Sequence, residues 1–386
     1  MRTERKNDLA PAVRKATLLA ATTFAFAASV SAARAEDPPL LSGARIEPVV
    51  SQGTQAPAPL GVFGVGLLNQ GQWAVSYAPV WSRLAGSQIG TSPAYAEYII
   101  QNVYSYHTPG SVGTPKLLRM VPSSFEFFGQ SVSAAYGVTK DVTLVAATTY
   151  WEKWVDMYTY HAGTGPSALL GTSTGHTDGI GDTLLAGVWR VYHDTMNQLN
   201  LNIGFSLPTG DTTANQTLFV PKNGGSYSYA RAFYGMQPGS GTLDFMPGLA
   251  YSGVLDQWSW GLAYRGRFPM DSNPDGWRYG AWNDLTGWGG YTWLPGFETT
   301  LRLDGMTQGR IGGFDPLITG FAQGANPYFY GGQWVSIFGG VNLAGKYFNI
   351  PKANLSLEVG LPVYQNLNGP QGARAVQANM ALTYKF

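Results

Sequence analysis

Hydrophobic and polar residues alternate with a period of two through most of the chain after residue 70. Between Leu199 and Leu207 every odd position is apolar, whereas the even positions carry Asn, Asn, Gly and Ser. The same pattern ends the chain, where every even position from Val376 to Phe386 is apolar. Successive side chains of a β-strand point to opposite faces, so this alternation predicts strands with one apolar and one polar face.

Twelve segments follow this pattern, and each has about ten residues, the length that a tilted strand needs to cross a bilayer. Short turns alternate with long loops between them, as in outer-membrane barrels with short periplasmic turns. The sequence predicts an all-β fold, a transmembrane antiparallel up-and-down β-barrel of about 12 strands over residues 71–386. The predicted strands lie near 72–82, 127–137, 142–151, 181–192, 199–209, 242–252, 257–268, 284–294, 297–306, 333–344, 353–363 and 375–386, and the predicted long loops are 83–126, 152–180, 210–241, 269–283 and 307–332.

The first 35 residues have the pattern of a secretory signal peptide. Basic residues precede a short apolar stretch from Ala16 to Val30, and Ala33-Arg34-Ala35 matches an A-x-A cleavage site. Residues 36–60 are rich in Pro, Gly and Gln and show little periodicity. We expect residues 1–35 to direct export and residues 36–70 to form a periplasmic N-terminal arm or a plug.

The composition narrows the class of protein further. Charged residues make up 12% of the chain, about half of the share usual in soluble domains, and aromatic residues make up 13%. The formal net charge of +1 argues against a nucleic-acid partner, and the absence of cysteine excludes disulfides and thiol chemistry. Aromatic strand ends, as at Trp258 and Trp293, suit contact with outer-membrane lipid. Phe386, which ends an alternating strand, resembles the sorting signal that the barrel-insertion machinery reads.

Alternation also assigns charged residues to the polar face, which would line the lumen of the barrel. Acids and bases on that face are balanced in number, which favours a neutral or zwitterionic solute, or internal ion pairs alone. Both interpretations stay open. The candidate pore-lining residues are Asp244, Arg265, Arg267, Trp288, Glu298, Arg302, Asp304 and Glu358.

A short turn at Leu255-Asp256 predicts how one pair of strands is aligned. In a hairpin about this turn, the residue numbers of two directly paired residues sum to roughly 510. This places Asp244 opposite Arg265 and Arg267 on the lumen face. Opposite charges on paired strands attract, more strongly where water is scarce. We therefore expect an ion pair near the outer mouth.

The turn 294–296 predicts the alignment of the next hairpin. The residue numbers of directly paired residues in this hairpin sum to about 590, which places Trp288 opposite Arg302. A guanidinium over an indole face is favourable, and Asp304 lies two residues further along the same face. We expect Trp288, Arg302 and Asp304 to form part of a constriction that sorts solutes.

Several short motifs resemble those of the putative outer-membrane transporter family named for the meta-cleavage pathway of phenol degradation. The matching stretches are Gly61–Gly64 with Gly71–Trp73, then Gly179–Thr183, then Leu207–Asp211, in the family's order and spacing. The resemblance implies passage or uptake of small, often aromatic or apolar, compounds. Some members carry His and Met where this chain has Val65–Leu68, so no metal-related role is carried over.

Signals for catalysis, cofactors and metals are absent from the sequence. None of the four histidines, His107, His161, His176 and His193, has serine two positions later, which argues against the His-x-Ser pair of outer-membrane lipid hydrolases. His161, His176 and Asp178 share one predicted loop but fit no compact metal motif. No nucleotide-binding motif occurs either. We expect a protein that is not an enzyme and that needs no cofactor.

The sequence favours an outer-membrane channel or transporter for passive passage or uptake of small solutes. Two alternatives stay open: an outer-membrane barrel enzyme such as a hydrolase, and a structural or adhesion barrel. Aromatic residues in the predicted outer loops could stack on an aromatic solute or merely pack the rim, and these are Tyr227, Tyr229, Phe233, Tyr234, Phe329 and Tyr330.

Overall fold

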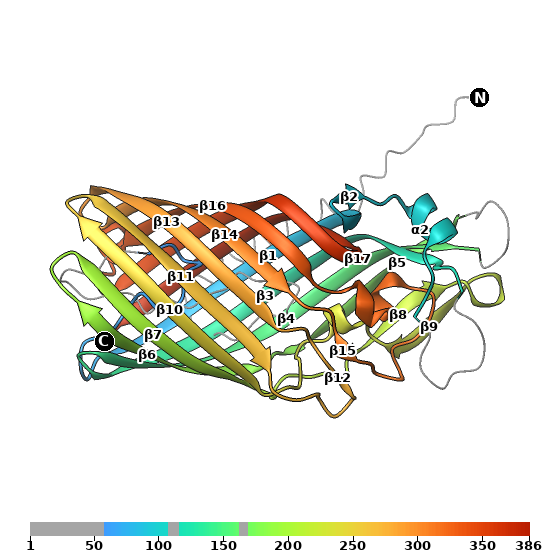
Figure 1. Ribbon diagram of the computed structural model, residues 1–386, viewed down its shortest axis with the longest axis horizontal. Coiled ribbons are helices and arrows are strands. Elements are labelled where there is room, and N and C mark those ends of the chain that lie inside the picture. The colour runs from blue at the N-terminus through green and yellow to red at the C-terminus, as the bar shows by residue number, and fades with distance from the viewer. Residues whose placement is uncertain (1–57, 107–115, 162–168) are drawn as a thin grey trace, which may run out of the picture.

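The computed structural model describes residues 58–106, 116–161 and 169–386. The predicted signal peptide, residues 36–57 and His107 lie outside the described residues. A sheet of thirteen strands, antiparallel throughout, closes on itself where β17 pairs with β1 (Figure 1). The strands of the closed wall are β1 (Trp73–Gly90), β3 (Met120–Thr139), β4 (Val142–Tyr160), β6 (Thr183–His193), β7 (Asn197–Leu207), β10 (Asp244–Leu255), β11 (Trp258–Pro269), β13 (Trp282–Leu294), β14 (Phe297–Gln308), β16 (Gly332–Ala344) and β17 (Ala353–Lys385).

The last strand, β17, has 33 residues and crosses the wall twice. Its first part pairs with β16 from Asn354 to Leu367, and its second part pairs with β1 from Leu367 to Lys385, antiparallel in both cases. Because all neighbours around the ring are antiparallel, the two parts run in opposite directions and form a hairpin. Gln365 Nε2 donates to the carbonyl of Arg374 across it at 3.0 Å. With the ten other wall strands, the two parts make twelve crossings, as the sequence predicts.

Exposure alternates along the wall strands. On β14, Arg302 and Asp304 are buried inside the barrel, whereas the neighbouring Leu301 and Leu303 are exposed outside. The outer surface is therefore apolar and the inner surface polar, which suits a barrel that closes all its backbone hydrogen bonds within a bilayer. Other exposed apolar residues of this surface include Leu144, Leu185, Ile203, Leu249, Leu262, Leu285, Ile337, Val359 and Leu361.

The two ends of the barrel differ in the length of their connections. The C-terminus lies at the end opposite α2 (Ala96–Asn102), β8 (Asn215–Val220) and β9 (Ser226–Arg231) (Figure 1). The backbone of the terminal Phe386 pairs with Trp73 at 3.0 and 3.1 Å, at the end that carries the short turns. Short turns mark the periplasmic side of outer-membrane barrels, so we call this end the inner end and the opposite one the outer end.

The stretch 152–180, which the sequence predicts as a long loop, is largely β-structure, so that prediction is wrong. The outer part of β4 pairs there with β5 (Leu169–Ile180), and β5 continues into β6 through Gly181 and Asp182. Between its apolar end residues Leu169 and Ile180, the exposed positions of β5 are polar. His176 is one of them, and it stacks on Trp154 with ring centroids 5.2 Å apart. A strand beyond the bilayer needs no apolar face, which removes the alternation that identifies strands elsewhere.

The remaining elements are short and lie mostly in the outer connections. No helix among the residues described is long and apolar enough to span a membrane. These elements are β2 (Ser92–Pro93), β12 (Trp277–Arg278), β15 (Gly312–Gly313) and the 3-10 helices η2 (Lys222–Gly224), η3 (Tyr234–Met236), η4 (Gln323–Ala325), η5 (Pro327–Phe329) and η6 (Gly345–Phe348).

Candidate functional site in the barrel lumen

The chain that precedes β1 passes through the barrel interior. Residues 58–68, here called the lumen segment, are buried except for the partly buried Ala58. Asn342 of β16 donates to the carbonyl of Ala58 at 3.2 Å, and Leu68 N donates to Thr143 Oγ1 of β4 at 2.9 Å. The lumen segment therefore crosses the interior from one side of the wall to another.

Amide side chains of β7 hold the middle of the lumen segment. Gln198 Nε2 donates to the carbonyl of Val65 at 2.8 Å. Asn200 Nδ2 donates to the carbonyls of Gly64 and Val65 at 2.7 and 2.8 Å. These amides lie on the face that the sequence predicts as polar, so the polar residues of β7 bind the chain's own backbone.

Two glycines of the lumen segment explain part of the first family-like motif. A Cβ at Gly61 would collide with the Arg302 guanidinium and with the Glu358 carboxylate. Gly64 has a φ of +86°, and a Cβ there would overlap the Asn202 amide. Only glycine combines a positive φ with so close an approach at no steric cost. The motif thus lets the lumen segment lie directly on the wall.

Arg302 is the centre of a buried ion-pair cluster against the lumen segment. Its side chain is 1% exposed. Nε and Nη2 donate to the two carboxylate oxygens of Glu358 at 2.8 Å each, and Nη1 donates to Asp304 Oδ1 at 2.7 Å. A bidentate pair of this kind fixes the guanidinium in orientation as well as in charge. Three of the predicted pore-lining residues are thus brought together.

The predicted alignment of Trp288 with Arg302 is confirmed, but the predicted stacking between them is wrong. Trp288 pairs with Arg302 across β13 and β14, as the sum of about 590 requires. The guanidinium carbon instead lies 3.9 Å from the ring centroid of Phe338, its partner on the other neighbour, β16. Trp288 packs against Val62 and Val65 of the lumen segment. Arg302 has two cross-strand neighbours, and the turn-based prediction considers only one.

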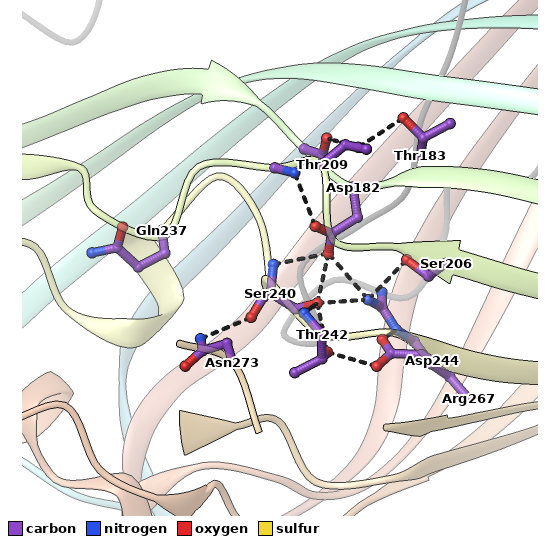
Figure 2. Close-up of polar contacts among 12 residues, drawn as sticks. Asp182, Thr183, Ser206, Thr209, Gln237, Ser240, Thr242, Asp244, Arg267 and Asn273 are labelled. Atoms are coloured by element: carbon purple, nitrogen blue, oxygen red, sulfur yellow. Dashed lines mark hydrogen bonds and ion pairs between the residues drawn. The ribbon is translucent and has the colours of Figure 1, made fainter. Parts of the chain in front are cut away.

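A second cluster surrounds Arg267 near the outer end of the lumen (Figure 2). Arg267 Nε lies 2.5 Å from Asp244 Oδ2, which confirms the predicted ion pair. Arg267 Nη2 lies 3.4 Å from Asp182 Oδ2 and 3.2 Å from Ser240 Oγ. The predicted register is wrong by three, because Leu255 pairs with Trp258 and Asp244 therefore lies opposite Pro269. Arg265 consequently lies opposite Gly248, not Asp244.

Asp182 joins the other two family-like motifs to an outer loop. Its Oδ1 accepts from Gly210 N at 3.1 Å, and its Oδ2 accepts from the backbone and hydroxyl of Ser240 at 2.8 and 2.6 Å (Figure 2). A Cβ at Gly210 would collide with the backbone of Gly239 and of Gly181. The motifs Gly179–Thr183 and Leu207–Asp211 are therefore adjacent in space around one carboxylate.

The loop that follows β9 folds into the outer half of the barrel. Residues 232–240, here called the inward loop, are buried throughout. Lys153, a fully buried residue of β4, donates from Nζ to the carbonyl of Gln237 at 2.5 Å and to that of Gly235 at 3.3 Å. Sequence analysis missed this lysine because it lies in a predicted loop. The inward loop thus lies in the outer half of the lumen, and the lumen segment lies in the inner half.

The other two predicted pore-lining residues also contact the interior. The Arg265 guanidinium carbon lies 5.2 Å from the ring centroid of Phe63 and 5.6 Å from that of Trp282. Glu298 accepts from Ser259 Oγ at 2.7 Å. All eight residues predicted for the polar face therefore lie inside the barrel, five of them in the two clusters and Trp288, Arg265 and Glu298 at three separate positions.

An aromatic cavity lies between the inward loop and the outer parts of the wall. The empty space between these elements, open mouth and adjoining solvent included, is about 540 Å³. Phe125 and Phe127 of β3 line it with parallel rings whose centroids are 6.0 Å apart. Phe233 and Met236 of the inward loop also contribute, as does Arg374, whose guanidinium carbon lies 4.5 Å from the ring centroid of Trp334.

Groups suited to a metal are absent from the described part of the chain, where no three His, Cys, Asp or Glu residues gather in a possible metal site. His176 and Asp178 are both outward residues of β5. Asp178 accepts a hydrogen bond from the Tyr150 hydroxyl. These residues therefore belong to the outer surface of the wall.

Comparison with known proteins identifies the fold. No protein-family model matches the chain, and no curated protein matches it either. An outer-membrane channel from Pseudomonas putida F1 has a similar structure, with a TM-score of 0.50 and 14% identity over 88% of this chain and 100% of that one. Two further structures are more distant. The CymD monoaromatic hydrocarbon channel has a TM-score of 0.42 and 10% identity over 91% of this chain and 98% of that one. The P. putida toluene transporter TodX has a TM-score of 0.40 and 11% identity over 82% of this chain and 90% of that one. The chain has the fold of a bacterial outer-membrane β-barrel.

Proposed function

We propose that this protein is an outer-membrane channel that passes small solutes down their concentration gradient. The closed barrel with an apolar outside and a polar, charge-paired inside carries this proposal. A barrel of this kind offers a path between the two sides of the membrane once the lumen segment or the inward loop moves. The similar P. putida F1 protein is described as an outer-membrane channel, which is consistent with this function.

The family named for the meta-cleavage pathway of phenol degradation is the best assignment for this channel. Its motifs have structural roles in this chain. The first allows close packing at Gly61 and Gly64, and the second and third meet where Asp182 contacts Gly210 and Ser240. Aromatic and other apolar compounds are then the proposed solutes. CymD and TodX are described as handling a monoaromatic hydrocarbon and toluene.

We further propose that the predicted pore-lining residues border the solute path. Trp288, Arg302 and Asp304 lie beside the lumen segment, so a solute that passes the inner half would meet them first when the segment moves. Ion pairing inside the wall offsets the charge of Arg302 and leaves this surface polar.

Solute flux into liposomes that contain the purified full-length protein tests this function. We expect swelling with small sugars and phenols that exceeds protein-free liposomes and rises when the lumen segment is loosened by Asn200→Ala. No swelling by either protein, with the barrel shown to be folded by its heat-modifiable migration in gels, would contradict a channel. Turnover of an ester or peptide substrate under the same conditions would favour the barrel-enzyme alternative.

Phe386 is proposed as a contact for the barrel-insertion machinery. It is 56% exposed at the inner end of the wall. Deleting Phe386 should lower the amount of heat-modifiable protein in the outer membrane, and an unchanged amount would remove this role.

A further inference from the structure

We propose that the aromatic cavity of the outer half binds an aromatic carboxylate, that is, one aromatic ring that carries an anionic acid group. This inference deepens the proposed channel function, on which its biological meaning rests. The ring would lie among Phe125, Phe127 and Phe233, and the carboxylate would face Arg374. The binding step itself can be measured without any transport.

Several aromatic rings line the cavity. Phe125 and Phe127 come from β3, Phe233 from the inward loop and Phe329 from η5, so four rings from three parts of the chain converge on one space. A Cβ at Gly372 would lie 2.9 Å from the Phe125 ring, and one at Gly324 would lie 2.9 Å from the Phe233 ring. Glycine at these positions brings the rings in close, and edge or offset stacking on a further ring adds to its burial.

The charge of the lining is positive. Arg374 lines the cavity, and Lys153 lies just behind it, with Nζ 6.0 Å from the ring centroid of Phe127. Among the described residues that line the cavity there is no Asp or Glu. An anionic group is therefore favoured over a cationic one, and more strongly than in water because most of the cavity lining is apolar.

Arg374 is held in place before any ligand binds. Its backbone N–H donates to Gln365 Oε1 at 2.8 Å, and its carbonyl accepts from Gln365 Nε2 at 3.0 Å across the β17 hairpin. Its guanidinium stacks on Trp334. A guanidinium fixed in this way presents a planar donor edge to a carboxylate with little further loss of side-chain freedom.

Titration of the detergent-solubilised full-length protein with benzoate, observed by ligand NMR, tests the proposal. Benzamide is the matched neutral probe of the same shape, and cyclohexanecarboxylate is the matched anion without an aromatic ring. We expect benzoate to bind roughly tenfold or more tightly than benzamide, as for a charged hydrogen bond. It should bind roughly two- to tenfold more tightly than cyclohexanecarboxylate, as for ring stacking.

Two variants assign the binding to this cavity. Arg374→Gln should abolish the preference for benzoate over benzamide, whereas Arg374→Lys should keep most of it. Lys222→Gln, which removes an exposed cation in η2, is the matched control and should bind as the wild type does. Phe125→Ala should weaken both probes, and it serves as the test if Arg374→Gln does not fold.

Equal binding of benzoate and benzamide by the wild type, or unchanged benzoate binding by Arg374→Gln or by Phe125→Ala, would overturn the proposed site. Liposome swelling separates this result from a failure of the channel. Swelling without selective benzoate binding leaves the channel and removes the site. Selective binding without swelling leaves the site and removes the channel.

Discussion

The inner and outer halves of the lumen contain the same arrangement of charged side chains, but the two arrangements contact different parts of the chain. In each, a buried arginine lies between two carboxylates, with Arg302 between Asp304 and Glu358, and Arg267 between Asp244 and Asp182. Both carboxylates of the inner cluster belong to wall strands. In the outer cluster, Asp182 also accepts hydrogen bonds from Gly210 and from Ser240, the last residue of the inward loop, so loop and wall share one carboxylate.

This difference separates the two parts that fill the barrel. The lumen segment packs on the inner cluster at Gly61, but the ion pairs of Arg302 would persist if the segment moved. The loop at Ser240 cannot leave without taking two hydrogen bonds from the buried carboxylate of Asp182. Hydrogen bonds to a charged group are worth more than the neutral hydrogen bonds that hold the lumen segment, so the lumen segment is the part whose movement costs less per bond broken.

The largest expected effect is loss of the inner cluster. Arg302→Met leaves two buried carboxylates without their cation, which costs about 3–5 kcal/mol in comparable pairs. We expect the barrel to unfold at a clearly lower temperature, measured as the change of its migration in gels after heating. The outer loops should remain protected from protease. Arg302→Lys, which keeps the charge, is the control and should lose less. A transition temperature for Arg302→Met equal to that of the wild type would show that the cluster does not stabilise the wall.

The contrast also shows what a sequence can and cannot predict here. Lipid on one side of the wall forces alternation, so the twelve crossings follow from the pattern, and the turn 294–296 gives the pairing of Trp288 with Arg302. The lumen segment carries no such signal, because it is surrounded by protein on every side. The aromatic cavity is still harder to predict, since Phe125 and Arg374 lie far apart along the chain and meet only because the barrel closes.

A smaller effect is expected from two glycine variants that isolate the contact of the lumen segment. Gly64 and Gly71 have similar φ values, +86° and +78°, so Ala at either costs about 1–3 kcal/mol of backbone strain. Only at Gly64 does the new Cβ also overlap a side chain, that of Asn202, whereas nothing lies within 4 Å at Gly71. We expect Gly64→Ala to raise single-channel conductance and Gly71→Ala to leave it unchanged. Equal conductance of the two variants would refute a lumen segment that limits flow.

The outer cluster is tested by Asp182→Asn. The new amide cannot accept from both Gly210 and Ser240 as the carboxylate does, and loss of charged hydrogen bonds costs about 1–3 kcal/mol. We expect faster cleavage of the loop between β7 and β10 by protease added outside intact cells, with little change in conductance. Asp271→Asn, at an exposed loop position, is the control. Loop cleavage at the wild-type rate would mean that Asp182 does not hold the loop.

The smallest effect is expected at the inner rim, far from both clusters, and it depends on pH. Hydrogen bonds from the backbone of Met196, the hydroxyl of Tyr192 and Asn197 hold the pKa of the exposed Asp194 carboxyl well below its usual range. A carboxyl whose pKa is lower in the folded state stabilises that state above its unfolded pKa of about 4, and this contribution is lost as the pH falls further. Asp194→Ala should therefore be slightly less stable to urea than the wild type at pH 7, and the difference should shrink progressively below about pH 4. A difference that is constant across this range would assign the effect to the shape of the turn and not to the charge of Asp194.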